Sequence, residues 1–297
     1  MTADTPPGSG RAGVGPPSGS GRAAGGPPSE PIDGSGSRCA RCVLAPNPSP
    51  MTLDGTNTWL VATPGSPSVI VVDPGPADAG HLRRVSALAT QDGRRVEQIL
   101  LTHGHADHSA GSRQLAELTS APVLAADPAH RLGEAGLAPG DVLTGAGCEI
   151  RVVVTPGHSA DSVCFLLPAD DVVLTGDTVL GRGTTVIAGD GNLSDYLGSL
   201  DRLRALADSA GLTALLPGHG PVLHDPAGTL DYYIGHRRDR LAEVTEALAA
   251  GDRTTAEIVA RVYRDVDRGL WKFAEWSVRA QLDYLDERGQ LPPGVRK

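Results

Sequence analysis

The chain has 297 residues, 40% of them hydrophobic, and a formal net charge of −9 at pH 7. This length and apolar content suffice for one main folded domain with appendages, because the buried fraction of the surface rises with chain length. No apolar run approaches the ~18 residues of a membrane-spanning helix. The composition therefore argues against a helical membrane protein, and we expect no membrane partner.

Residues 1–42 are expected to be a disordered leader rich in Gly, Pro and Ser. Residues 1–38 contain ten Gly, seven Pro and six Ser, with only Met1, Val14 and Ile32 as aliphatic side chains larger than Ala. Such a segment cannot bury enough apolar surface to offset the entropy of ordering. It also lacks the apolar core of a secretory signal and the Arg pattern of a transit peptide, so a cytoplasmic location is the default expectation.

The four cysteines are too few for a disulfide framework in a chain of this length. Cys39 and Cys42 have the spacing of half a zinc knuckle, but no second pair follows, and their role stays open. Cys164 lies within an apolar run and is expected to be a small buried hydrophobic residue.

Four short apolar runs each precede a small residue and then a histidine or an aspartate. They are residues 99–101 before His103, 152–154 before His158, 172–174 before Asp177, and 214–216 before His219. Runs of this length bounded by Gly and Pro are typical of buried strands, so each polar residue would lie at the C-terminal end of a strand. A single turn of this kind is commonplace, but four in order predict polar residues that converge on one sheet edge.

The densest group of polar residues is the segment from His103 to His108. It holds four metal-binding side chains within six residues: His103, His105, Asp107 and His108. A helix or a strand cannot aim all four at one ion, but a loop leaving a strand can divide them between two ions. Imidazole and carboxylate are ligands for zinc-class ions, so the segment predicts metal binding; the alternative is a polar surface loop.

These residues resemble the metallo-β-lactamase superfamily, whose pattern HxHxDH, His, Asp, His is matched at every position. The resemblance implies one metal ion held by His103, His105 and His158, a second held by Asp107, His108 and His219, and Asp177 bridging the two. It also implies an α/β fold, a four-layer αβ/βα sandwich with the metals at the edge of the sheets.

Longer segments are similar to the β-lactamase-like protein 2 subfamily, namely residues 47–60, 181–185 and 218–221. This subfamily includes a mitochondrial endoribonuclease that acts on single-stranded RNA, and it is similar to carrier-protein thioesterases of polyketide pathways. We expect a catalytic domain over residues 43–235 and a winged-helix-like helical module over residues 236–297.

The implied ligand set predicts hydrolysis. Two divalent ions, most simply zinc, would share a hydroxide, lower the pKa of bound water toward about 7 and polarise the scissile bond. Asp177 would hold the ions at a fixed spacing, and Asp107 would hold or relay the proton, so these two are the catalytic candidates. Asp73, which ends another apolar run, would orient an imidazole from behind or would only cap a turn.

Ligand identity separates the chain from several relatives. Dioxygen-reducing di-iron members carry a carboxylate where His105 stands, and true β-lactamases lack the aspartate that stands here as Asp177. Nucleases that process mRNA ends carry a large insertion before the last histidine, whereas Asp177 and His219 are 42 residues apart. Because true β-lactamases lack the aspartate that is present here, antibiotic cleavage is a minor alternative. Arg182 and the hydroxyls of Thr184 and Thr185, in the loop that follows Asp177, are candidate contacts for phosphate or carboxylate; the alternative is that they only shape the loop.

The last part of the chain has the pattern of helices. Apolar side chains recur at helical spacing over residues 230–248, 258–263 and 276–285. Thr254 or Thr255 would cap the second helix. A role of this module in packing or in the substrate pocket is favoured over contact with RNA. Trp271, Phe273 and Trp276 are expected to serve the core more than base stacking.

Charge bears on the choice of substrate. Residues 1–50 and 237–297 each carry one net positive charge, which leaves −11 for residues 51–236. A core this acidic is unsuited to duplex nucleic acid and argues modestly against RNA.

The subfamily resemblance favours a phosphodiesterase that cuts single-stranded RNA. The alternative is a thioester or acyl-ester hydrolase of the glyoxalase II or carrier-protein thioesterase kind, and a catalytically silent scaffold is disfavoured because the seven buried polar ligands would be costly without metal. The sequence leaves the oligomeric state open.

Overall fold

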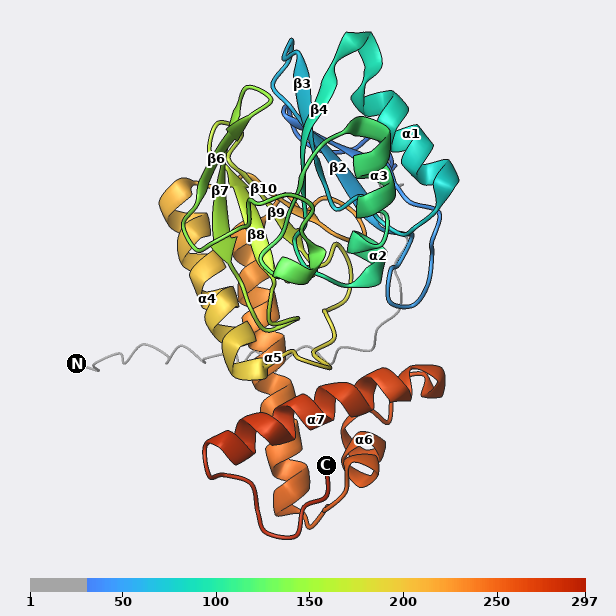
Figure 1. Ribbon diagram of the computed structural model, residues 1–297. Helices are drawn as coiled ribbons and strands as arrows, with labels where there is room; N and C mark the ends of the chain where they lie inside the picture. Colours follow the sequence, from blue (N-terminus) through green and yellow to red (C-terminus); the bar gives the residue numbers. More distant parts are fainter. Residues whose placement is uncertain (1–30) are drawn as a thin grey trace, which may run out of the picture.

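A computed structural model describes residues 31–297, which form two five-stranded sheets and seven α-helices (Figure 1). In spatial order the first sheet contains β1 (Ala40–Leu44), β2 (Asn57–Val61), β3 (Ser68–Val72), β4 (Arg95–Leu100) and β5 (Val123–Leu124). The second contains β10 (Ala214–Pro217), β9 (Val172–Gly176), β8 (Val163–Leu167), β7 (Cys148–Val154) and β6 (Val142–Gly145). The helices are α1 (Ala79–Ala89), α2 (Ala106–Ser109), α3 (Ser112–Thr119), α4 (Leu193–Ala210), α5 (Pro226–Ala249), α6 (Thr255–Val262) and α7 (Trp271–Glu287).

The two sheets pack face to face, with helices on both outer faces (Figure 1). In β3, Ile70 and Val72 belong to the apolar cluster between the sheets, whereas Val69 and Val71 belong to the cluster with α1 and α3. This alternation follows from the two-residue repeat of a strand, and a strand covered on both faces reads as a continuous apolar run. On the other side α4 and α5 cover the second sheet. The predicted four-layer αβ/βα sandwich is confirmed.

The sheets are joined at the edge where β4 and β10 end. Asn57, which is fully buried at the start of β2, donates its backbone N–H to the Gly218 carbonyl over 2.8 Å. Its side-chain amide donates to the carbonyls of Pro217 and Gly220 over 2.9 and 2.8 Å. A buried amide with three carbonyl partners orders the segment after β10, so this edge is a rigid frame for side chains.

The first strand begins earlier than expected. β1 starts at Ala40, so the predicted leader over residues 1–42 is wrong at its C-terminal end. Cys39, Ala40 and Cys42 are buried in the cluster between the sheets, and β1 pairs antiparallel with β2. The strand is short and follows a Gly-rich segment, so its pairing partner decides its structure. The expectation of disorder over residues 1–30 lies outside the described residues.

The C-terminal helices form a module around the end of α5 (Figure 1). Thr254 caps α6, as predicted, in a capping box with Glu257. The expected boundary between residues 235 and 236 falls inside α5, which runs unbroken for 24 residues. Its first half packs Leu230 against α4, and its second half packs Leu248 against α6 and α7, so one helix serves both units.

None of the helices in residues 31–297 combines the length and apolar character that crossing a bilayer requires.

All four cysteines are free and buried. Burial raises the pKa of Cys148 and of Cys164 to about 11, so neither thiol reacts readily near neutral pH. We expect a soluble thiol reagent to leave the native protein unmodified over minutes at pH 8 and to label four thiols after unfolding. Rapid labelling of Cys164 in native protein, located by mass spectrometry, would contradict its place in the core.

Candidate metal centre

All seven predicted ligands lie together at the edge where the sheets are joined. Three overlapping groups have donor atoms within 4.8 Å of one another: His103, His105 and His158; His103, His108 and Asp177; and Asp107, His108 and His219. As predicted, most of these residues follow strand ends. Asp107 and His108 lie on the single turn of α2 instead of an open loop, with His105 as its N-terminal cap residue.

The first group consists of three imidazoles whose nitrogens converge. His105 Nδ1 lies 3.1 Å from His103 Nε2 and 3.0 Å from His158 Nε2. The rings of His103 and His158 are buried, and His105 is more exposed. The three rings meet edge to face, with ring planes nearly perpendicular to one another, and their nitrogens converge.

Partners behind the rings determine which nitrogens carry hydrogen. His158 Nδ1 donates to the Val186 carbonyl over 2.9 Å. The Thr102 hydroxyl donates to Asp73, so it accepts from His103 Nδ1 over 3.0 Å. Burial lowers the pKa of His103 well below the usual value and also lowers the pKa of His158, which keeps both rings neutral. Two Nε2 lone pairs therefore face one nitrogen of the third ring, an arrangement that suits a bound cation.

The second group has the same construction. His108 Nε2 and His219 Nε2 lie 3.2 Å apart. Behind them, His108 Nδ1 donates to Asp73 Oδ2 over 2.9 Å, and His219 Nδ1 donates to the Gly55 carbonyl over 3.1 Å. With their Nδ1 atoms engaged, neutral rings would again direct two lone pairs at the same point. Asp107 completes the group with a carboxylate oxygen 3.2 Å from His219 Nε2.

Asp177 lies between the two groups. Its Oδ1 is 3.3 Å from His108 Nε2 and 3.4 Å from His219 Nε2, and its Oδ2 is 3.7 Å from His158 Nε2. Oδ1 is buried and has no hydrogen-bond partner among the described residues. A buried carboxylate oxygen without a donor is costly unless a cation faces it. The donor set therefore fits divalent metal ions on either side of Asp177.

Electrostatics couples the second group tightly. Burial opposes charge on Asp177, but the His219 and His108 imidazoles outweigh it and hold the pKa of Asp177 well below its usual range. Burial also opposes charge on His108, but Asp177 and Asp73 raise its pKa well above the usual value. The pKa of His219 rises to about 9, against burial, because Asp177 and Asp107 are close. These imidazoles would release protons when a cation binds.

Asp73 orients the centre from behind, as one of the two sequence interpretations predicted. Besides accepting from His108, it accepts from the Thr102 backbone N–H over 2.8 Å and from the Thr102 hydroxyl over 2.7 Å. Its backbone has φ 52°, a left-handed conformation that is strained for most residues but tolerated by Asp and Asn. The carboxylate thus orients one ligand of each group: His108 directly, and His103 through the Thr102 hydroxyl.

The loop after Asp177 contributes structure and not charge. Thr185 Oγ1 lies 3.0 Å from His158 Nδ1, and the buried Arg237 guanidinium donates to the Thr185 carbonyl, which pins the loop to α5. Arg182, expected as a substrate contact, pairs instead with Asp54 at the surface and does not line the adjoining cavity. This pairing favours the second of the two expectations for Arg182, that it shapes the loop.

Two cavities adjoin the centre and share His105. One, of about 470 Å³, is lined by His105, Asp107, His158 and Asp177 together with Met51, Thr52, Ala106, Val186, Ala188, Gly189 and Trp276. Trp276 comes from α7, so the C-terminal module supplies part of the wall. This agrees with the expected packing or substrate-pocket role of the module, although Trp276 itself lies outside the apolar cluster of the module.

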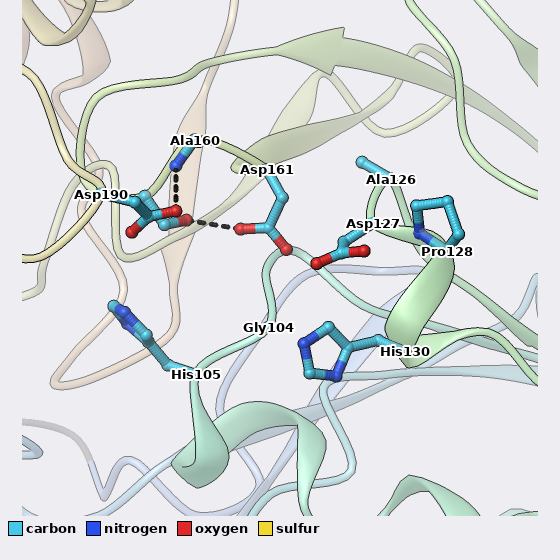
Figure 2. Close-up of a pocket in the computed structure, with 10 residues that line it drawn as sticks. Gly104, His105, Ala126, Asp127, Pro128, His130, Ala160, Asp161 and Asp190 are labelled. Atoms are coloured by element: carbon cyan, nitrogen blue, oxygen red, sulfur yellow. Dashed lines mark hydrogen bonds between the residues drawn. The ribbon is translucent and has the colours of Figure 1, made fainter.

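The second cavity, of about 520 Å³, is acidic (Figure 2). Asp127, Asp161 and Asp190 lie around it together with His130 and His105. Asp190 accepts from the Ala160 backbone N–H over 3.1 Å, which holds its carboxylate at the rim. Negative charge therefore gathers on one side of the metal centre.

Some contacts of the site were not predicted from the sequence. Gly218 has to be small, because a Cβ there would lie 2.7 Å from both Asp177 Oδ1 and His108 Cε1. Met51 lies within residues 47–60, which resemble the subfamily, so this resemblance was a signal that could have identified it as a site residue. Trp276 and the Val186 carbonyl carried no signal, because their role depends on how distant elements pack.

Comparisons with known proteins agree with this geometry. The family model for the metallo-beta-lactamase superfamily matches residues 51–219, and the model for the beta-lactamase associated winged helix domain matches residues 254–291. A solved structure of a beta-lactamase domain protein from Burkholderia ambifaria is 24% identical, with a TM-score of 0.75, over 90% of this chain and 94% of that one.

Two curated relatives are similar over most of their length. The beta-lactamase-like protein 2 homolog of Drosophila melanogaster is 30% identical over 84% of this chain and 88% of the relative. The atrochrysone carboxyl ACP thioesterase of Aspergillus fumigatus is 32% identical over 78% of this chain and 75% of the relative. With the two-sheet fold and the histidine and aspartate cluster, these matches identify the chain as a member of the metallo-beta-lactamase superfamily of hydrolases, with a C-terminal winged-helix domain.

Proposed function

We propose that the chain hydrolyses neutral acyl thioesters or acyl esters with the help of two divalent metal ions. The observation that carries this proposal is the charge of the two cavities at the metal centre. One is lined by three aspartates and the other mainly by apolar side chains, and no Lys or Arg lines either of them within the described part of the chain. A polyanion such as RNA needs basic groups along its path, whereas a neutral carbonyl substrate does not.

The metal ligands are assigned from the two groups of converging donors. His103, His105 and His158 would hold one ion, Asp107, His108 and His219 a second, and Asp177 would contact both. When bound, such ions activate water near neutral pH and polarise the carbonyl that is attacked. Zinc suits this nitrogen and oxygen donor set.

The chain's own carboxylates divide the remaining tasks. Asp107 is partly exposed and lines the cavity, so it can hold a proton next to the substrate and pass it to the leaving group. The pKa of Asp107 is lowered, against the effect of burial, by His219 and His108, which keeps it ionised and able to accept that proton. Asp177 is more deeply buried and serves to hold the two groups together.

The thioesterase relative supports the same substrate class. The protein named as an ACP thioesterase is similar to more than three quarters of this chain. Cleavage of single-stranded RNA remains the second candidate, supported by the subfamily resemblance and by one contact of Trp276. Lys272 Nζ lies 5.3 Å from the centre of this half-buried ring, and a basic group beside an aromatic side chain suits a stacked base.

An assay with both substrate classes tests the proposal. Purified protein supplied with zinc should hydrolyse an acyl thioester of N-acetylcysteamine, which carries no charge, and should leave a labelled single-stranded RNA intact. A chelator should stop the reaction, and renewed zinc should restore it. Cleavage of the RNA with no turnover of any thioester or ester would contradict the proposal and favour the second candidate.

Asp73→Asn should weaken zinc binding by about 10- to 100-fold, because the carboxylate behind a ligating histidine raises its basicity and fixes its orientation. Competition with a chelating dye measures this affinity. Asparagine tolerates the left-handed backbone, so the fold should remain. Asp92→Asn is a matched control, because Asp92 is an exposed aspartate with φ 60° away from the centre. Equal zinc affinities for the two variants would argue against the orienting role.

A further inference from the structure

The apolar cavity at the metal centre continues between the two domains. It shares Ala188, Gly189 and Trp276 with a neighbouring cavity of about 500 Å³. That cavity extends along α7, past Ala280, to Arg279 and Asp283. The two cavities therefore adjoin at the three residues they share and lie along the boundary between the loop of residues 186–191 and α7, from the metal ligands outward; we call them the groove.

The walls of this groove change character along its length. Next to the metal ligands they are apolar, with Met51, Val186 and Ala188 on the catalytic domain and Trp276 on α7. Beyond the metal-ligand carboxylates Asp107 and Asp177, the charged side chains that line the groove are Arg279 and Asp283 at its far end. A substrate portion that lies in the groove therefore meets hydrocarbon first and charge last.

The position of Trp276 at the domain boundary is set by contacts of its ring and of α7. Its ring meets Phe273 edge to face, with ring centres 5.4 Å apart. The helix that carries it is anchored to the catalytic domain: Asn192 Nδ2 donates to Glu287 over 2.9 Å, and Arg288 donates to Ser194 Oγ over 3.1 Å. The indole therefore forms part of the cavity wall at this boundary.

We propose that this groove binds the apolar acyl portion of the substrate and that Trp276 sets the preference for acyl length. The proposal rests on the proposed thioester or ester hydrolysis. Apolar walls beside the reacting centre favour a hydrocarbon chain, because each buried methylene adds about three- to fourfold to kcat/KM. The acidic cavity on the other side of His105 is polar and does not offer this gain.

A series of N-acetylcysteamine thioesters from acetyl to decanoyl tests the inference, since every member has the same neutral leaving group. With the natural protein, kcat/KM should rise with acyl length and then level off. In Trp276→Ala the rise should be smaller, with about tenfold lower kcat/KM for decanoyl and a much smaller change for acetyl. Trp276→Phe should retain most of the rise, and Met51→Ala, on the opposite wall, should reduce it.

Tyr232→Ala provides the matched control, because Tyr232 is a 59% exposed aromatic residue on α5 that lines neither cavity. It should leave the whole series unchanged. A binding measurement separates this inference from the hydrolysis itself: the decyl thioether of N-acetylcysteamine, which cannot be hydrolysed, should bind about tenfold more weakly to Trp276→Ala by calorimetry.

Each outcome decides between the two proposals. Parallel acyl-length profiles for the natural protein and Trp276→Ala, or equal thioether affinity, would overturn the role of the groove while leaving hydrolysis intact. No turnover of any thioester or ester, with thioether binding still dependent on Trp276, would overturn the proposed function and leave the apolar groove standing.

Discussion

Asp177→Asn is expected to lower the rate of hydrolysis by at least about a thousandfold and to reduce the bound metal from two ions to one or none. Asp177 lies between both groups of ligands, and its pKa, lowered by His219 and His108 against the effect of burial, keeps it charged. A neutral amide would remove the charge that balances two cations. A thousandfold lower rate corresponds to the loss of about 4 kcal/mol of transition-state stabilisation.

The measurement combines kcat/KM with elemental analysis of the purified variant. Asp201→Asn is a suitable control, because Asp201 is exposed on α4, away from the ligand groups. It should keep both the metal content and the rate. Full metal content and activity within tenfold of the natural protein in Asp177→Asn would refute the assignment of Asp177 as the shared ligand.

Removal of residues 252–297 is expected to destabilise the remaining protein strongly and to cause aggregation. The deletion would uncover Val244, Ala247 and Leu248 on α5, which are buried against α6 and α7. It would also remove contacts of Tyr284 with the cluster of α4 and the second sheet. Size-exclusion chromatography and thermal unfolding measure the result, and a soluble monomer with unchanged Tm would contradict the packing of the module on the catalytic domain.

A point substitution tests the same packing with less disturbance. Leu282→Ala removes a fully buried side chain of α7 and should cost about 2–5 kcal/mol, or a Tm shift of about 5–15 °C. Leu270→Ala is the matched control, because Leu270 is 40% exposed and its loss should cost less than about 0.5 kcal/mol. Similar Tm values for the two variants would argue against a packed module.

Local pattern was enough to predict the strands that precede the ligands, the C-terminal helices and the ligand types. The apolar runs before His103, His158, Asp177 and His219 became strands, because covered strands need consecutive apolar residues whatever their neighbours are. The cap at Thr254 was predictable for a similar reason, since a capping box is complete within four residues. Each of these features depends on interactions that are close in sequence.

Tertiary structure alone decided the partners and the walls of the site. β1 gains its hydrogen bonds from β2, so a short segment after a Gly-rich stretch became a strand. The Val186 carbonyl that sets the tautomer of His158 lies 28 residues away in sequence. Trp276 reaches the cavity because α7 packs beside the catalytic domain, more than 50 residues after the last predicted ligand. Backbone carbonyls are the same in every residue, and an aromatic side chain suits a core and a cavity wall equally, so only the packing of distant elements could assign these roles.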